Sequence, residues 1–222
     1  MKKRLILALL WLALPLFVCV AGGTQENSVE GAAAVENSPQ TAGSAVGLGN
    51  DSIGNPSNLQ EEGMNALVVY FSWSGNTRAV ATEIQRRTGA DMFELIPQQP
   101  YTDDYNELLD VAQRERRNHA RPAIANQIAD IDAYDVIFLG YPNWWADMPM
   151  IIYSFLDQYD LSGKTVAPFC TSGGSGLSGT VRAIKSLEPE ANVVDGLHVG
   201  GSSASGSGDI VARWLGGLGF SR

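Results

Sequence analysis

The chain has 222 residues, a net charge of −9 at neutral pH and 45% hydrophobic residues. This apolar content is enough for a packed core, which excludes disorder along the whole chain, and the acidic balance argues against nucleic acid as a partner. The only cysteines, Cys19 and Cys170, lie in segments of very different composition, and His119 and His198 lie far apart. We therefore expect neither a disulfide framework nor a zinc or haem site.

Residues 1–22 have the order of an export signal, with basic residues first, then a long apolar run, then small residues. Cleavage after Ala21 is one interpretation. In a second, the stretch that ends at Cys19 resembles a lipobox, whose cysteine is lipidated and becomes the first residue. Because the apolar run is just short of the about 20 residues of a spanning helix, an uncleaved anchor is a third. All three place the rest of the chain outside the cytoplasm, and contact with a membrane is expected through this segment only.

Residues 23–64 form a second region, rich in Gly, Ser, Asn, Ala, Glu and Gln and without any aromatic residue. Such a stretch buries too little apolar surface to offset the entropy of ordering it. We interpret it as a disordered linker. A long linker favours a tethered domain that reaches for partners over a freely secreted one.

From residue 65 onward, short apolar runs alternate with longer amphipathic stretches, the pattern of βαβ units. Strands are expected over Ala66–Phe71, Asp91–Ile96, Asp135–Gly140, Thr165–Cys170 and Val193–Val199. Helices are expected over Thr77–Thr88, Asp104–Arg117, Met148–Gln158, Ser178–Leu187 and Asp209–Leu218. The sequence thus predicts one doubly wound α/β domain over residues 65–222. In such sheets ligands bind beyond the carboxyl ends of the strands.

The loop after the first strand combines three hydroxyls, an amide and a glycine directly before a helix. Its residues are Ser72, Trp73, Ser74, Gly75, Asn76 and Thr77. Together with the free N–H groups of a helix start, they make a nest for an anion that needs no lysine. The alternative is an ordinary helix cap at Asn76 or Thr77. A cap needs one such residue, so the three hydroxyls around Gly75 favour phosphate binding.

The stretch Val69–Thr77 resembles the first strand and phosphate loop of the flavodoxin family. The family pattern Thr/Ser-x-Thr-Gly-x-Thr is matched by Ser72, Ser74, Gly75 and Thr77, with serine in place of the second threonine. The resemblance extends from about Leu67 to Phe220. It implies a flavodoxin-like five-stranded parallel sheet in the order 2-1-3-4-5, with the phosphate of flavin mononucleotide (FMN) held by Ser72, Ser74, Gly75, Asn76 and Thr77.

The loop after the third strand contains two adjacent tryptophans. Its candidate residues are Pro142, Asn143, Trp144 and Trp145. Neighbouring indoles in a loop cannot both enter one core easily, so at least one should be exposed or line a pocket. The alternative is that both only cover the end of the sheet. In the flavodoxin resemblance this loop flanks the isoalloxazine ring of FMN.

The glycine-rich loop after the fourth strand has three interpretations. The spacing Gly174-x-Gly176-x-x-Gly179, with Asp195 further on, matches a dinucleotide fingerprint, although in a Rossmann domain that motif follows the first strand. A cysteine phosphatase loop fails, because it needs arginine six residues after Cys170. The favoured interpretation, by resemblance and position, is the second flavin loop of flavodoxins. Its ring contacts are then Thr171, Ser172, Gly173, Gly174 and Ser175.

Other conspicuous residues have simpler interpretations. Cys170 is expected to be a buried apolar residue. The basic cluster from Arg114 to Arg121 complements the dipole of a helix C-terminus, and His119 within it should be solvated. We expect Gly200–Gly208 to be a loop before the last helix, and nothing to split the last strand.

Three functions are consistent with these features. The first is an FMN-dependent electron carrier between a reductase and an acceptor protein, which needs no catalytic side chain. The second is an FMN-dependent reductase that oxidises NADH or NADPH and reduces quinones or similar small acceptors. The third is a module that binds flavin without turnover.

Overall fold

The computed structural model describes residues 65–220. The export signal, the linker and Cys19 lie outside the described residues, so what was inferred for them stays a prediction. Within residues 65–220, no helix is both long and apolar enough to cross a membrane.

The centre of the domain is a parallel sheet. Its strands are β1 (Ala66–Tyr70), β2 (Asp91–Glu94), β3 (Val136–Pro142), β4 (Thr165–Ser172), β5 (Asn192–Val193) and β6 (Leu197–Gly200). The spatial order is β2-β1-β3-β4-β5, and β6 also pairs with β4. This arrangement confirms the predicted doubly wound sheet in the order 2-1-3-4-5.

The last strand differs from its prediction, because it is interrupted. After β5, Val194 still donates its N–H to the Val166 carbonyl at 3.0 Å, but the Asp195 carbonyl instead accepts the indole N–H of Trp214 at 3.1 Å. A Cβ atom on Gly196 would lie 3.0 Å from a methyl group of Leu177. Pairing with β4 resumes at β6, so the expectation of an unbroken last strand is wrong at these residues.

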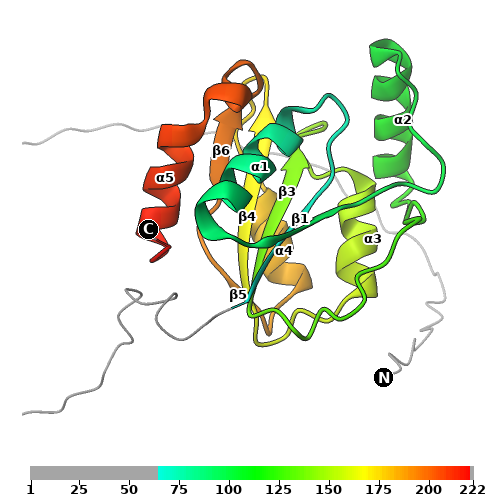
Figure 1. Ribbon diagram of the computed structural model, residues 1–222. Coiled ribbons are helices and arrows are strands. Elements are labelled where there is room, and N and C mark those ends of the chain that lie inside the picture. Colours follow the sequence, from blue (N-terminus) through cyan, green and yellow to red (C-terminus); the bar gives the residue numbers. More distant parts are fainter. Residues whose placement is uncertain (1–64, 221–222) are drawn as a thin grey trace, which may run out of the picture. The chain divides into compact units, whose positions relative to one another are not determined.

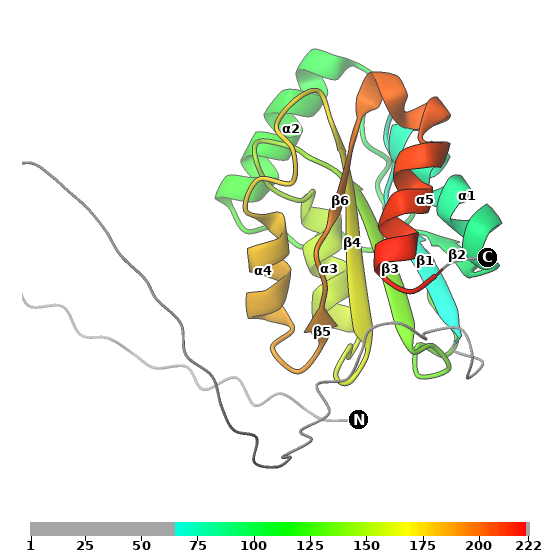
Figure 2. The same ribbon diagram turned by 90° about the vertical axis from the view of Figure 1, so that its left-hand side faces the viewer.

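Five α-helices and one short 3₁₀-helix connect and cover the strands. They are α1 (Asn76–Thr88), α2 (Tyr105–Arg117), α3 (Met150–Gln158), α4 (Thr180–Leu187), η1 (Gly201–Gly206) and α5 (Gly208–Gly217). Helices α1 and α5 cover one face of the sheet, and α3 and α4 cover the other (Figures 1 and 2). All five predicted helices are confirmed to within two residues at each end.

The core lies on both sides of β1, β3 and β4. Val69 and Ile137 face α3 and α4, whereas Val68 and Phe138 face α1 and α5, and all four side chains are fully buried. Because both faces of these strands are covered, their sequences are continuous apolar runs and do not alternate with polar residues.

Helix α2 is less deeply packed than the others. It buries only Leu108 and Ala112 and lies beside α3 at one side of the domain (Figure 1). Its start is capped by Asp104, whose carboxylate accepts the Glu107 N–H at 2.9 Å. Loop residues also hold α2, since Trp145 donates to the Leu109 carbonyl and Tyr101 donates to the Glu115 carboxylate. Because Trp145 lies in the loop that follows β3, α2 lies beside the carboxyl end of the sheet.

Gly140 of β3 is closely packed and pairs with Phe169 of β4. A Cβ atom on Gly140 would lie 2.1 Å from Cζ of the Phe169 ring. We therefore predict that Gly140→Ala lowers the free energy of unfolding by about 2 kcal/mol or more, because it overpacks a core without free volume. Urea unfolding followed by circular dichroism measures this.

The matched control is Gly216→Ala in α5, where no heavy atom lies within 4 Å of the added methyl group. This substitution should raise the free energy of unfolding by about 0.5–1 kcal/mol through helix propensity. Similar stability of the two variants would contradict the packing argument.

Candidate functional site

The three candidate loops meet at one edge of the sheet. The strand register pairs Tyr70 with Gly140 and Pro142 with Thr171. The loops that follow β1, β3 and β4 therefore leave the sheet side by side, as expected for the carboxyl ends of parallel strands.

The phosphate loop leaves the first turn of α1 open. Gly75 has φ +86°, a conformation that favours glycine, and its carbonyl accepts the Ala79 N–H at 3.0 Å. The cap residue Gly75 has no side chain that could cap the helix, and within residues 65–220 the N–H groups of Gly75, Asn76 and Thr77 have no hydrogen-bond partner. Several N–H donors at the positive end of a helix dipole can bind an anion.

The hydroxyls of this loop have different environments. Thr77 is buried, and its Oγ1 lies 2.9 Å from Oγ1 of Thr171, so this hydrogen bond ties the start of α1 to the end of β4. The Ser72 hydroxyl accepts the Arg78 N–H at 3.2 Å. Ser74 is exposed, and its hydroxyl has no partner among the described residues. Ser74 therefore has the hydroxyl that is free to contact a ligand.

The tract expected as a loop before the last helix forms η1 and packs against the phosphate loop. A Cβ atom on Gly201 would lie 3.1 Å from the Asn76 side-chain nitrogen. The absence of a side chain at Gly201 thus lets the start of η1 approach α1.

The tryptophan pair sits in a strained two-residue turn. Trp144 and Asp147 exchange two backbone hydrogen bonds of 2.9 and 3.1 Å. The two residues between them, Trp145 and Ala146, have φ +56° and +60°. Left-handed backbone is costly for residues with a Cβ atom, and such strain is often found at functional sites.

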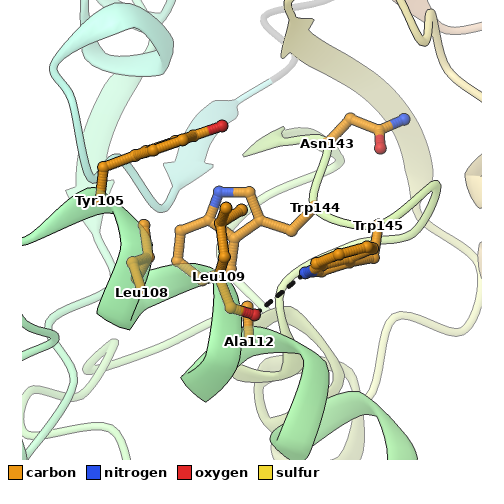
Figure 3. Close-up of a pocket in the computed structure, with 7 residues that line it drawn as sticks. All are labelled: Tyr105, Leu108, Leu109, Ala112, Asn143, Trp144 and Trp145. Carbon is orange, nitrogen blue, oxygen red and sulfur yellow. Dashed lines mark hydrogen bonds between the residues drawn. The ribbon is translucent and has the colours of Figure 1, made fainter.

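This turn sends the two indoles in different directions. Trp144 packs edge-on against Phe71 and Tyr101, with centroids 5.5 and 5.3 Å away. Trp145 is 42% exposed and donates its indole N–H to the Leu109 carbonyl of α2 at 3.1 Å (Figure 3). The expectation that one ring of the pair is exposed or lines a pocket is confirmed.

The indoles and α2 enclose a pocket of about 220 Å³. Its lining is Tyr105, Leu108, Leu109, Ala112, Asn143, Trp144 and Trp145 (Figure 3). The wall formed by α2 is mainly apolar, and Asn143 contributes the only side-chain amide. We call this the ring-side pocket.

Asn143 connects the ring-side pocket to the glycine-rich loop. Its amide nitrogen donates to the Gly176 carbonyl at 3.0 Å and to the Ser178 hydroxyl at 2.9 Å. Its amide oxygen is buried and has no hydrogen-bond partner among the described residues. An unpaired buried acceptor costs about 1–3 kcal/mol, so a donor from a ligand would stabilise it.

The glycine-rich loop is organised by the Ser172 hydroxyl. This oxygen accepts the N–H groups of Gly174 and Gly176 at 3.3 and 3.1 Å and lies 2.9 Å from Nε2 of His198. Since both amides donate to the hydroxyl, its own proton is available to the histidine ring. Gly173, Gly174 and Ser175 are exposed, so a planar group could approach their backbone.

The structure argues against the other two interpretations of this loop. Asp195 follows Val194, whose N–H bonds to the Val166 carbonyl, and Val166 lies six residues before Ser172 in the continuous strand β4. Asp195 is therefore roughly 15 Å further down the sheet than Ser172. That is too far for a dinucleotide contact at the loop. Burial raises the pKa of the Cys170 thiol to about 12, so it is neutral and unreactive near pH 7, which confirms the expected buried residue.

Sequence reasoning missed two features of the site. His198 contacts the loop through strand pairing, because β6 places it beside Cys170. The segment before α2 is the other: Trp73 donates its indole N–H to the Thr102 carbonyl at 2.9 Å and lies 6.2 Å from the Tyr105 ring. No local sequence motif signals the contact of His198 or the contacts of Trp73.

Among the described residues no group of three His, Cys, Asp or Glu could hold a metal ion.

Comparison with known proteins gives consistent results. The sequence model of a family described as flavodoxin matches residues 65–217. A crystal structure of a putative flavoprotein from Bacteroides eggerthii is 34% identical over 69% of this chain and 97% of its own, with a TM-score of 0.63. A crystal structure of a putative flavoprotein from Bacteroides uniformis is 30% identical over 70% of this chain and 99% of its own, also with a TM-score of 0.63. A flavoprotein from Lactobacillus acidophilus, crystallised in complex with FMN, is 25% identical over 66% of this chain and 99% of its own, with a TM-score of 0.55. No curated protein gives a match.

The strain in the tryptophan turn is measurable. We predict that Ala146→Gly raises the free energy of unfolding by about 0.5 kcal/mol, because glycine adopts φ +60° at no steric cost. Thermal or urea unfolding checks this.

The control is Ala212→Gly, an ordinary helical position in α5, which should lower the free energy of unfolding by about 1 kcal/mol. Equal losses in both variants would mean that residue 146 is not strained.

Proposed function

Because this chain belongs to the flavodoxin family, we propose that residues 65–220 bind FMN and serve as an electron carrier. The observation that carries the proposal is the convergence of three features at one sheet edge: an open helix N-terminus, a tryptophan turn and an exposed glycine loop. The FMN complex of the Lactobacillus acidophilus flavoprotein supports FMN as the cofactor.

The described residues fit each part of FMN. The N–H groups of Gly75, Asn76 and Thr77 and the Ser74 hydroxyl would hold the phosphate without a cation. The isoalloxazine ring would lie between the tryptophan turn and the glycine loop, where the free acceptor of Asn143 can receive an N–H group. Bound FMN supplies transfer of one or two electrons.

The chemistry of these loops favours a carrier. None of the fifteen residues predicted to contact the cofactor has a titratable side chain, so the site offers no general acid or base directly at the ring. The partners would then be redox proteins, one that reduces the flavin and one that accepts its electrons.

A second candidate is an FMN-dependent reductase of small quinone-like acceptors. The ring-side pocket supports it, because an apolar space of about 220 Å³ beside Trp145 could receive a planar acceptor. Binding of flavin without turnover is a third outcome that the experiment below separates.

We further propose that the domain acts outside the cytoplasm, tethered through its N-terminal segment. The support is the sequence pattern of residues 1–64. Mass spectrometry of the mature N-terminus would distinguish cleavage after Ala21, lipidation of Cys19 and an uncleaved anchor.

The role of the phosphate loop is tested with Ser74→Ala. We expect about tenfold weaker FMN binding, the effect of one hydrogen bond to a charged group, with no loss of stability because this hydroxyl has no partner within residues 65–220. Quenching of FMN fluorescence measures the affinity. Ser186→Ala, which removes an exposed hydroxyl from α4, is the control, and equal affinities of the two variants would refute this role.

The function itself is tested by anaerobic titration of the FMN-loaded chain, followed by its visible spectrum. For a carrier we expect bleaching by dithionite and none by NADH or NADPH. Rapid bleaching by a nicotinamide and reoxidation by a quinone would establish the reductase instead. Flavin that no reductant bleaches would indicate a binding module, and absence of flavin would refute the proposal.

A further inference from the structure

Cations are concentrated in one part of an acidic domain. Residues 65–220 contain eighteen Asp and Glu and eleven Lys and Arg, and four of the eleven lie within residues 114–121. Three of these arginines, Arg114, Arg116 and Arg117, are in the last turn of α2, where they complement the helix dipole as predicted from the sequence. The dipole alone does not explain why side chains from this segment also face a common cavity.

This cavity has a volume of about 490 Å³ and lies between the end of α2 and the start of α3. Its lining is Arg116, Arg117, His119, Arg121, Asp147, Met150 and Tyr153. We call it the arginine pocket. With three guanidinium groups and one carboxylate, its lining is net positive, and it stays so when the pairing of Arg121 with Asp157 outside the lining is counted.

The guanidinium groups of the arginine pocket are only partly neutralised. The guanidinium group of Arg117 forms no ion pair or hydrogen bond within residues 65–220. Arg116 is paired with Asp147 only at 3.7 Å, a distance at which geometry is poor for a hydrogen bond. Arg121 is bound to Asp157 and lies 5.2 Å above the Tyr153 ring. Two of the three groups can therefore turn to a ligand.

Asp147 is already held by other donors. Its Oδ1 accepts the Tyr153 hydroxyl at 2.8 Å and the Met148 N–H at 2.8 Å. Burial raises the pKa of Tyr153, so its hydroxyl stays protonated and keeps donating to Asp147. If Arg116 turns from Asp147 to an incoming anion, the Asp147 carboxylate therefore keeps two hydrogen-bond donors.

We propose that the arginine pocket binds the phosphate group of a small phosphorylated ligand. A phosphate monoester is largely dianionic near pH 7, and its oxygens fit the planar forks of Arg116 and Arg117, the two guanidinium groups that can turn to it. A volume of 490 Å³ suits a small molecule. The proposal does not depend on FMN, because the pocket is separate from the phosphate loop.

The position of the pocket suggests which ligands use it. Arg116 lies seven residues after Leu109 on the same helix, so the arginine pocket is about 10 Å along α2 from the ring-side pocket. Asp147 links the two, since its backbone closes the tryptophan turn and its side chain lines the arginine pocket. A ligand with a ring at one end and a phosphate at the other could occupy both.

The test is isothermal titration of the full chain with inorganic phosphate and pyrophosphate. FMN is present at saturation, so that the phosphate loop is occupied. Arg116→Gln combined with Arg117→Gln should weaken binding by about tenfold or more, and Arg117→Gln alone by at least about threefold, since it breaks no ion pair or side-chain hydrogen bond within residues 65–220. Arg182→Gln, the same charge change on an exposed part of α4, should change the affinity by less than about twofold.

Equal affinities in the arginine-pocket variants and Arg182→Gln would overturn the proposal, as would absence of phosphate binding. If the chain binds no FMN, the proposed function fails, but the difference between these variants still decides this inference. Comparing NADP⁺ with NAD⁺ then identifies the source of the phosphate. Tighter binding of NADP⁺ that is lost in the double variant supports a nicotinamide nucleotide, and equally weak binding of both supports another phosphate compound.

Discussion

The register of the three central strands is the constraint on which the site depends. β1, β3 and β4 are buried on both faces, and a slip by one residue would exchange the side chains that face α1 and α5 with those that face α3 and α4. Gly140 makes the constraint stricter, because only a glycine fits beside the Phe169 ring. Because this register is fixed, the three loops leave the sheet at the same edge.

The loops themselves satisfy only part of their own hydrogen bonding. The Ser172 hydroxyl accepts two N–H groups of the glycine-rich loop, and the hydrogen bond between the Thr77 and Thr171 hydroxyls fixes the phosphate loop to the end of β4. Within residues 65–220, the N–H donors at the start of α1 and the amide oxygen of Asn143 have no hydrogen-bond partner. The fold therefore fixes the backbone of the site firmly while keeping selected polar groups unpaired, an arrangement that lowers the cost of ordering a ligand.

Periodicity, capping residues and glycine spacing were sufficient to predict the helices, the strands and the three loops, whereas the strand order was predicted from the resemblance to the flavodoxin family. The sequence could not predict contacts made across strands or between loops. His198 reaches Ser172 only through pairing of β6 with β4, and Trp145 reaches Leu109 only through a turn that no glycine marks. The break in the last strand likewise depends on Trp214, a residue far along the chain that competes for a backbone carbonyl.

Helix α2 combines two kinds of surface, and its direction relates them. Its first half gives the apolar wall of the ring-side pocket, and its last turn brings cations to the arginine pocket. An acidic domain repels anions over most of its surface, so an anionic ligand is least repelled at the C-terminal end of α2, where the arginines lie. That end of α2 lies next to the tryptophan turn. The contrast between an acidic surface and this group of arginines would therefore guide a phosphorylated ligand toward the ring-side pocket.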